Sequence, residues 1–225
     1  MRCAAAALLV SSTGAFANEE SIPEWQQAVV DGSPEALVEL ALFYGTNPAG
    51  ADEQRAFDLL FIAANRFDQP VAQVNLGVFY QFGGEGMNVD LPRAAYWYAR
   101  AARSGNPAAQ SRLADLYSRG SGTDVNFEKA ADLYTKAADS GFADAQVELG
   151  YIFEMGDLGE VDYDAAMGLY QEAADQGNVI AQYNLAEMYE LGKGGPVNLD
   201  QARSWYGRSA EGGLDEAKEA LQRLQ

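Results

Sequence analysis

Two glutamates with tyrosines nearby come closest, in type and spacing, to residues that do chemistry. Glu187 and Glu190 lie three positions apart, which is about one turn of a helix and close enough to share a ligand. A carboxylate pair with a tyrosine could act as acid and base, as in glycosidases, or could line a glycan-binding groove. Acids at this spacing are also common on any acidic helix. The prediction is therefore a protein that is not an enzyme, with a catalytic or glycan-binding groove as the alternative.

Other familiar chemistries lack their residues. The chain has no histidine and one cysteine, Cys3, which excludes the usual nucleophile–base pairs and most zinc sites. GGEG at 83–86 and GKGG at 192–195 faintly resemble phosphate-binding loops, but neither continues as G-K-[ST]. Both stretches fill the place of a loop between helices. No catalytic residue and no cofactor are predicted.

The charge balance is strongly acidic. Fifteen Lys and Arg stand against 33 Asp and Glu, a net charge of −18. Such a chain repels phosphate backbones, so nucleic acid is excluded as a partner and a basic or neutral one is favoured. One loop gathers four acids, but their spacing is not that of an EF-hand and no metal site is predicted. These acids are Asp157, Glu160, Asp162 and Asp164.

The first 17 residues read as a secretory signal peptide. Arg2 gives a positive start, Cys3–Val10 is apolar, and Ala15-Phe16-Ala17 is a small-residue cleavage site. Cleavage near Ala17 would give an exported protein, periplasmic or secreted, that has no thiol because Cys3 is removed. The alternative is a disordered cytosolic N-terminus. The apolar run is too short to cross a bilayer and no other is longer, so no membrane span is expected.

The elements that must position these residues repeat along the chain. AQVNLGVFYQFG at 72–83 and AQYNLAEMYELG at 181–192 are nearly the same phrase, and its leucine recurs at spacings of 36 or 37 residues. This regularity indicates a stacked array rather than one globular core. The key leucines are Leu40, Leu76, Leu113, Leu149, Leu185 and Leu221.

Each unit contains two helical patterns. In the first, Ala72, Leu76 and Tyr80 form a stripe with a period of four, and Gly83 closes the helix. The second helix carries a tyrosine with an alanine four residues to either side, and a glycine follows it seven residues after the tyrosine. Each second helix should begin after a short polar side chain that caps its free N–H groups. These caps are Asp90, Asn126, Asp162 and Asn198.

Five full pairs and two half-units account for the chain after the signal peptide, giving twelve helices and no strands. The half-units are a capping helix within 18–33, which contains Trp25, and another at 214–225. Such ends differ from inner repeats because their outer face meets water. In the first full unit TNPAGADEQ (46–54) replaces the usual loop, with Asp52 near the loop's valine position. The array covers 34–213, divided at about 34–69, 70–106, 107–142, 143–178 and 179–213.

The pattern resembles the Sel1-like repeat family, relatives of the tetratricopeptide repeat, over about residues 23–225. The family pattern is A-x-x-x-L-G-x-x-Y-x-x-G, a loop ending in Val, then A-x-x-W-Y-x-x-A-A-x-x-G. Two positions depart from this pattern, since Ala114 and Ala186 replace the family glycine. The chain also lacks the cysteine pairs that some family members carry. The matching positions are Ala72, Leu76, Gly77, Tyr80, Gly83, Val89, Ala94, Trp97, Tyr98, Ala101, Ala102 and Gly105.

This resemblance implies an all-α fold, a right-handed superhelical solenoid whose inner surface binds other proteins. Exported bacterial members are often adaptors or regulators in the cell envelope, and the family shares no catalytic residues. We therefore expect a monomeric interaction scaffold of the bacterial envelope that regulates a receptor or an envelope enzyme. A passive spacer without a specific ligand is a further alternative.

Positions two before, two after and five after each key leucine point away from the apolar stripe. They carry valines and tyrosines among acids, which predicts a groove for a peptide with apolar and basic groups. Tyr151 and Tyr183 are the expected anchors, and the glutamates should steer the partner. The alternative is that neighbouring helices bury this row. The predicted partner-binding residues are Val78, Asp115, Tyr151, Glu154, Tyr183, Glu187 and Glu190.

Overall fold

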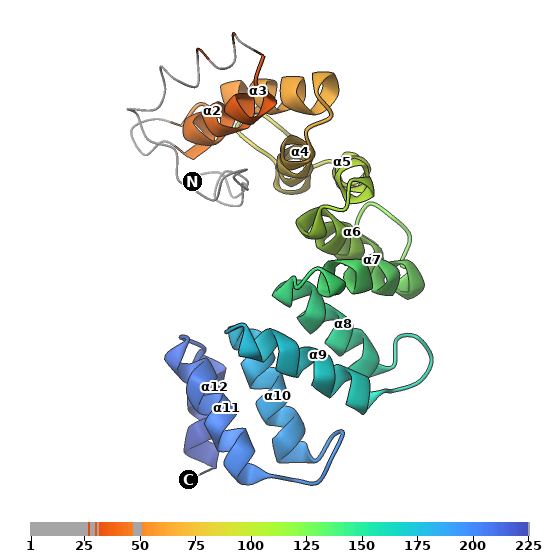
Figure 1. Cartoon of the computed structure of the whole chain (residues 1–225), viewed down its shortest axis with the longest axis vertical. Coiled ribbons are helices and arrows are strands. Elements are labelled where there is room, and N and C mark those ends of the chain that lie inside the picture. Colours follow the sequence, from red (N-terminus) through yellow and green to blue (C-terminus); the bar gives the residue numbers. More distant parts are fainter. Residues whose placement is uncertain (1–26, 28–29, 31, 47–50, 225) are drawn as a thin grey trace. The chain divides into compact units, whose positions relative to one another are not determined.

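The computed structural model describes residues 27, 30, 32–46 and 51–224. Over these ranges the chain forms eleven helices, α2–α12, and no strand beyond one isolated bridge between Gly84 and Met87 (Figure 1). The predicted all-α fold class is confirmed. The predicted signal peptide, and the capping helix within 18–33 apart from four residues, lie outside the described residues.

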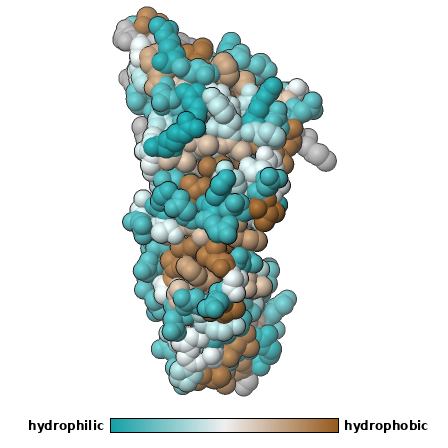
Figure 2. Space-filling model, turned by 90° about the vertical axis from the view of Figure 1, so that its right-hand side faces the viewer, coloured by the Kyte–Doolittle hydropathy of each residue, from teal (hydrophilic) through white to brown (hydrophobic). Residues whose placement is uncertain are grey.

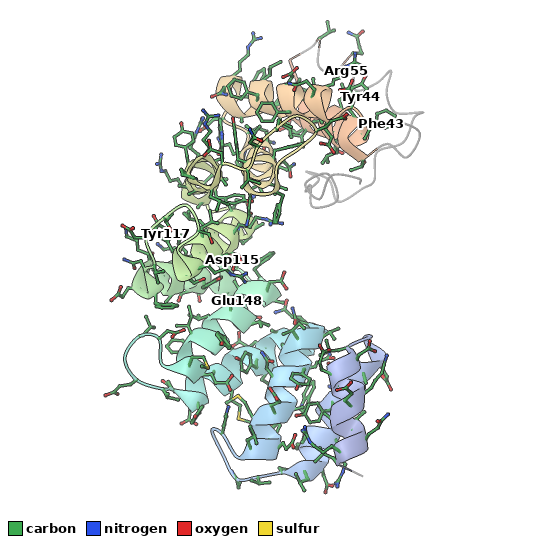
Figure 3. The ribbon with its side chains drawn as sticks, turned by 180° about the vertical axis from the view of Figure 1, so that it is seen from behind. Phe43, Tyr44, Arg55, Asp115, Tyr117 and Glu148 are labelled. Carbon is green, nitrogen blue, oxygen red and sulfur yellow. The ribbon has the colours of Figure 1, made fainter. Side chains whose placement is uncertain are left out.

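The chain divides into two compact units, residues 1–125 and 126–225. In the first unit each helix packs on the one before it. At its start Phe43, Tyr44 and Arg55 lie together (Figure 3), with the Arg55 guanidinium 4.7 Å from the centre of the Tyr44 ring. Its helices are α2 (Pro34–Thr46), α3 (Glu53–Arg66), α4 (Pro70–Phe82), α5 (Leu91–Arg103) and α6 (Pro107–Arg119).

The second unit continues the same alternation of first and second helices. Consecutive helices pack on each other from α7 to α12, and the last one stands alone as a half-unit. The unit begins with α7 (Phe127–Asp139), α8 (Ala143–Met155) and α9 (Tyr163–Asp175). It ends with α10 (Val179–Leu191), α11 (Leu199–Glu211) and α12 (Asp215–Arg223).

Capping side chains set the start of each second helix, as predicted. In α5, α7, α9 and α11 the cap oxygen accepts a hydrogen bond of 2.7–3.1 Å from the backbone N–H three residues on. Asp52 caps α3 in the same way at 2.9 Å, which gives this residue of the irregular loop a role. Asn106 and Asn178 cap the first helices α6 and α10, which the sequence interpretation did not anticipate. The four predicted caps are Asp90, Asn126, Asp162 and Asn198.

Buried tyrosines of the second helices form the centre of each unit. Tyr98 belongs to the first unit and Tyr134, Tyr170 and Tyr206 to the second, and each is at most 1% exposed. The family glycine follows from this packing. A Cβ at Gly150 would lie 2.7 Å from Cε1 of Tyr170, closer than carbon atoms approach. The glycine therefore leaves room for the ring of its own repeat.

Candidate protein-interaction face

The first helices of the second unit carry most of the predicted partner-binding residues. Tyr151 on α8 is 49% exposed, and its hydroxyl makes no hydrogen bond within the described part of the chain. Glu187 is half-buried and occupies the same position on α10, two residues after the key leucine of its repeat. An exposed ring and a carboxylate thus stand at equivalent places on two consecutive first helices.

Glu154 lies one turn further along α8, and its carboxylate is already engaged. The Tyr170 hydroxyl donates a hydrogen bond of 2.9 Å to Oε2, and the Lys193 ammonium lies 2.8 Å from Oε1. Only 16% of the Glu154 side chain is exposed. Because Lys193 follows α10, this carboxylate joins its own repeat to the next one.

Glu190 on α10 has the same arrangement in the next repeat. Tyr206 donates a hydrogen bond of 2.7 Å to its Oε2, and the Arg223 guanidinium of α12 lies 2.9 and 2.8 Å from the two oxygens. We call these two sets the tyrosine–glutamate–cation triads: Tyr170–Glu154–Lys193 and Tyr206–Glu190–Arg223. Their carboxylates hold neighbouring repeats together, which leaves less of their charge to steer a partner.

Tyr183 is shared between the core and the surface. Its ring centre lies 5.4 Å from that of Tyr206, and its hydroxyl donates a hydrogen bond of 3.1 Å to Glu187. The side chain is half-buried against the core of the second unit. Tyr183 therefore orients Glu187 and presents one edge to solvent, whereas Tyr151 is the more accessible of the two predicted anchors.

The first unit contributes less to this face than predicted. Val78 is fully buried because α4 packs against both α3 and α5, so a partner cannot reach it, and this corrects the sequence interpretation. Val74 and Val147 are also buried, as the alternative of a covered row expected for such positions. Asp115 on α6 (Figure 3) is half-buried and lies near Tyr98, where burial raises the tyrosine's pKa and the Asp115 charge adds to that rise.

Structural contacts occupy both members of the glutamate pair and one acid of the acidic loop. Glu187 and Glu190 each accept a hydrogen bond from a tyrosine, and Glu190 also pairs with Arg223. Asp162 is occupied in capping α9. In the described ranges no group of three His, Cys, Asp or Glu side chains is placed to hold a metal ion. Gly83 and Gly192, the first residues of the stretches 83–86 and 192–195, close α4 and α10.

The triads predict an alkaline sensitivity. Burial, and after it the paired glutamate, raises the pKa of Tyr170 and of Tyr206. Both tyrosines ionise near pH 10 in the unfolded chain, so the stability that they contribute is complete below that pH and is lost as the pH rises above it. We expect the tyrosinate absorbance of the folded protein to lag behind that of the urea-unfolded protein. Coincident titration curves, or a lag unchanged by Tyr170→Phe/Tyr206→Phe, would contradict this.

The sequence interpretation missed the cations of the triads. Lys193 and Arg223 follow their glutamates by 39 and 33 residues, so no local spacing connects them. A usable signal was the scarcity of positive charge. Residues 126–225 hold 7 Lys and Arg against 19 Asp and Glu, and two of these seven face the glutamate row.

The Sel1 repeat model matches residues 34–66, 70–106, 107–142, 143–178 and 179–214. The chain is similar in structure to c5321, a protective antigen of uropathogenic Escherichia coli with an SLR fold, at TM-score 0.77 and 31% identity, over 91% of this chain and 44% of that one. It also resembles a Sel1 repeat protein from Oxalobacter formigenes, at TM-score 0.80 and 26% identity, over 92% and 89%.

A further relative is the ERAD-associated E3 ubiquitin-protein ligase component HRD3A of Arabidopsis thaliana. It is 30% identical over 70 residues, which span 31% of this chain and 10% of that protein. The chain thus covers only a small part of this relative and less than half of the Escherichia coli antigen. Within the described residues, no helix is both long and apolar enough to cross a membrane.

Proposed function

Because the chain belongs to the Sel1 repeat family, whose repeats build protein-interaction scaffolds, we propose that it is an adaptor that binds another protein and catalyses no reaction. Five Sel1 repeats match between residues 34 and 214, and the described residues of each repeat form two helices. The likeness to a named component of a ligase assembly, in the short part that aligns, supports a role in binding proteins.

The proposed place of action is the bacterial cell envelope, where the adaptor would regulate a receptor or an envelope enzyme. The signal-peptide pattern of residues 1–17 supports export. The two similar solved structures come from bacteria, and one is a protective antigen. Fractionation of cells that make the protein tests this location, with a variant that lacks residues 1–17 as the control.

The proposed binding face is the row of first helices in the second unit, and Tyr151 is the observation that carries it. Tyrosine offers a large contact area and a hydrogen bond, and this ring is half exposed with an unused hydroxyl. Glu187 and the edge of Tyr183 continue the face on α10. With a net charge of −12 over residues 126–225, the partner should carry apolar and basic groups.

This face can be tested by site-specific photocrosslinking. A crosslinker replaces Tyr151 in cells that make the protein, and Tyr96 provides the matched control. Tyr96 is a tyrosine 55% exposed on the second helix α5. We expect one protein to be captured at position 151 and not at 96. Tyr151→Ser should then weaken binding of that protein about 10- to 30-fold, as loss of an aromatic hot spot does.

The chains altered at position 151 and at position 96 should have the same helical circular dichroism as the parent chain, since Tyr151 and Tyr96 are both exposed. Equal capture at positions 96 and 151, or an affinity that Tyr151→Ser leaves unchanged, would remove this face from the proposal. Capture that disappears entirely at moderate salt would indicate nonspecific charge attraction.

A further inference from the structure

Exposed aliphatic side chains recur along one edge of the second unit, where each first helix turns into its second helix. The α8–α9 and α10–α11 loops lie on the same side of this unit (Figure 1), and apolar surface gathers there in the lower part of Figure 2. Each of six side chains is 40–59% exposed. We call this set the apolar edge: Met155, Leu158, Val161, Leu191, Val197 and Leu199.

Leu158 is the member of this set that packing explains least. Gly122 and Gly194 occupy the same place in their loops, nine residues after the key leucine, and each lies against the first residue of an earlier second helix. A Cβ there would lie 2.5 Å from the carbonyl carbon of Leu91 or 3.0 Å from the carbonyl oxygen of Tyr163. The α8–α9 loop instead carries a leucine that is 41% exposed. Its side chain is available for contact with another molecule.

Unpaired acids surround this leucine. Asp157, Glu160 and Asp164 are exposed, and none forms an ion pair within the described part of the chain. Aliphatic groups bordered by free carboxylates are complementary to a surface with apolar side chains bordered by Lys and Arg. Charge of this sign also disfavours anionic lipid as the occupant.

The secondary structure selects the form of the partner. The described residues of this unit contain helices and no strand, so an extended peptide finds no sheet edge to join. Tyr163, close to Val161, is 37% exposed, but the six side chains of the edge carry no aromatic ring, whereas a proline-rich ligand docks in a groove lined with several such rings. We propose that the apolar edge binds an amphipathic helix of a partner protein, with Lys and Arg bordering its apolar face. This surface adjoins the proposed adaptor face, because Met155 lies one turn after Tyr151 on α8 and Leu191 lies one turn after Glu187 on α10.

A synthetic amphipathic helix of leucine and lysine is the probe for this proposal. Its binding to the full chain is measured by fluorescence anisotropy at moderate salt. We expect Leu158→Ser and Leu191→Ser each to weaken binding about tenfold, the loss expected for roughly one buried aliphatic contact. Ile180→Ser is the matched control, because Ile180 is 47% exposed at the opposite end of α10 from Leu191. It should leave the affinity unchanged.

Two further peptides separate the sources of affinity. A leucine and glutamate helix with the same apolar face should bind at least about tenfold more weakly. A scrambled leucine and lysine peptide should also bind weakly, because it has the charge but no apolar face. Equal binding of either peptide, or insensitivity to both edge substitutions, would overturn the proposal.

Light scattering of the chain alone tests whether the edge binds a second copy of the chain instead. A dimer that dissociates on Leu158→Ser would assign the edge to a second copy and overturn the proposal, whereas a monomer supports it. Loss of peptide binding with intact binding at Tyr151, or the reverse, distinguishes this surface from the proposed adaptor face. Since Leu158 and Leu191 lie in different repeats, one variant suffices if the other fails to fold.

Discussion

Replacing Tyr170 by alanine is expected to lower the free energy of unfolding by about 3–5 kcal/mol, the usual cost of deleting a buried aromatic ring. The ring has no exposed surface and fills the space that Gly150 leaves. Its hydroxyl also donates to Glu154, a carboxylate that is largely buried. Alanine would remove both the packing and the hydrogen bond, whose loss leaves an acceptor short of one partner.

Urea unfolding followed by circular dichroism measures this effect, with Tyr170→Phe as the matched control. Phenylalanine keeps the ring and removes only the hydroxyl, so it should cost about 0.5–1.5 kcal/mol. The Lys193 ion pair would still hold Glu154 in place. Equal costs for the two variants would mean that the hydrogen bond, not the ring, dominates at this position. If Tyr170→Ala lowered the free energy of unfolding by less than a substitution at an exposed position does, the ring would not be central to the packing.

The periodic part of the fold could be predicted from the sequence because it depends on local rules. Asp90 caps α5 through a side chain three residues from its donor, and a helix with tyrosine and alanine four residues apart buries both on one face. Repetition of these rules in several units made the assignment robust. The end of α6 follows a local rule too, because Gly120 has a φ of 62°, a left-handed conformation that favours glycine.

The binding face was only partly predictable because direction along a helix does not determine what covers it. Val78 and Tyr151 occupy the same position in their repeats, yet one is fully buried and the other is half exposed. The difference arises from side chains of other helices. In the same way, Glu154 looked like a free acid until Lys193, 39 residues away, provided its partner. Such long-range pairs leave no trace in the local spacing.

The apolar edge shows the reverse case, in which the sequence held a signal that was not used. Leu158 stands at the loop position that Gly122 and Gly194 occupy elsewhere, and exposed acids flank it in the sequence. A departure from a repeat at one position, once packing accounts for the others, marks a residue whose role is to be sought outside the fold.

Gly122→Ala is expected to destabilise the first unit by about 2–5 kcal/mol, because alanine there meets two separate penalties. The residue has a φ of 75°, a left-handed conformation that costs an L-residue about 1–2 kcal/mol. The new Cβ would also lie 2.5 Å from the Cβ of Leu91 and 2.7 Å from its carbonyl oxygen. Relief of that clash moves the loop off the start of α5, which adds about 1–3 kcal/mol.

Gly86→Ala separates the two penalties in the same unit. Gly86 has a nearly equal φ of 73°, but no atom lies within 4 Å of the added Cβ. It should therefore cost only about 1–2 kcal/mol, the conformational part alone. Thermal and urea unfolding of both variants measure the difference. Equal destabilisation would show that the α6 loop gives way to the methyl group at no cost, and that contact with Leu91 does not hold one repeat on the next.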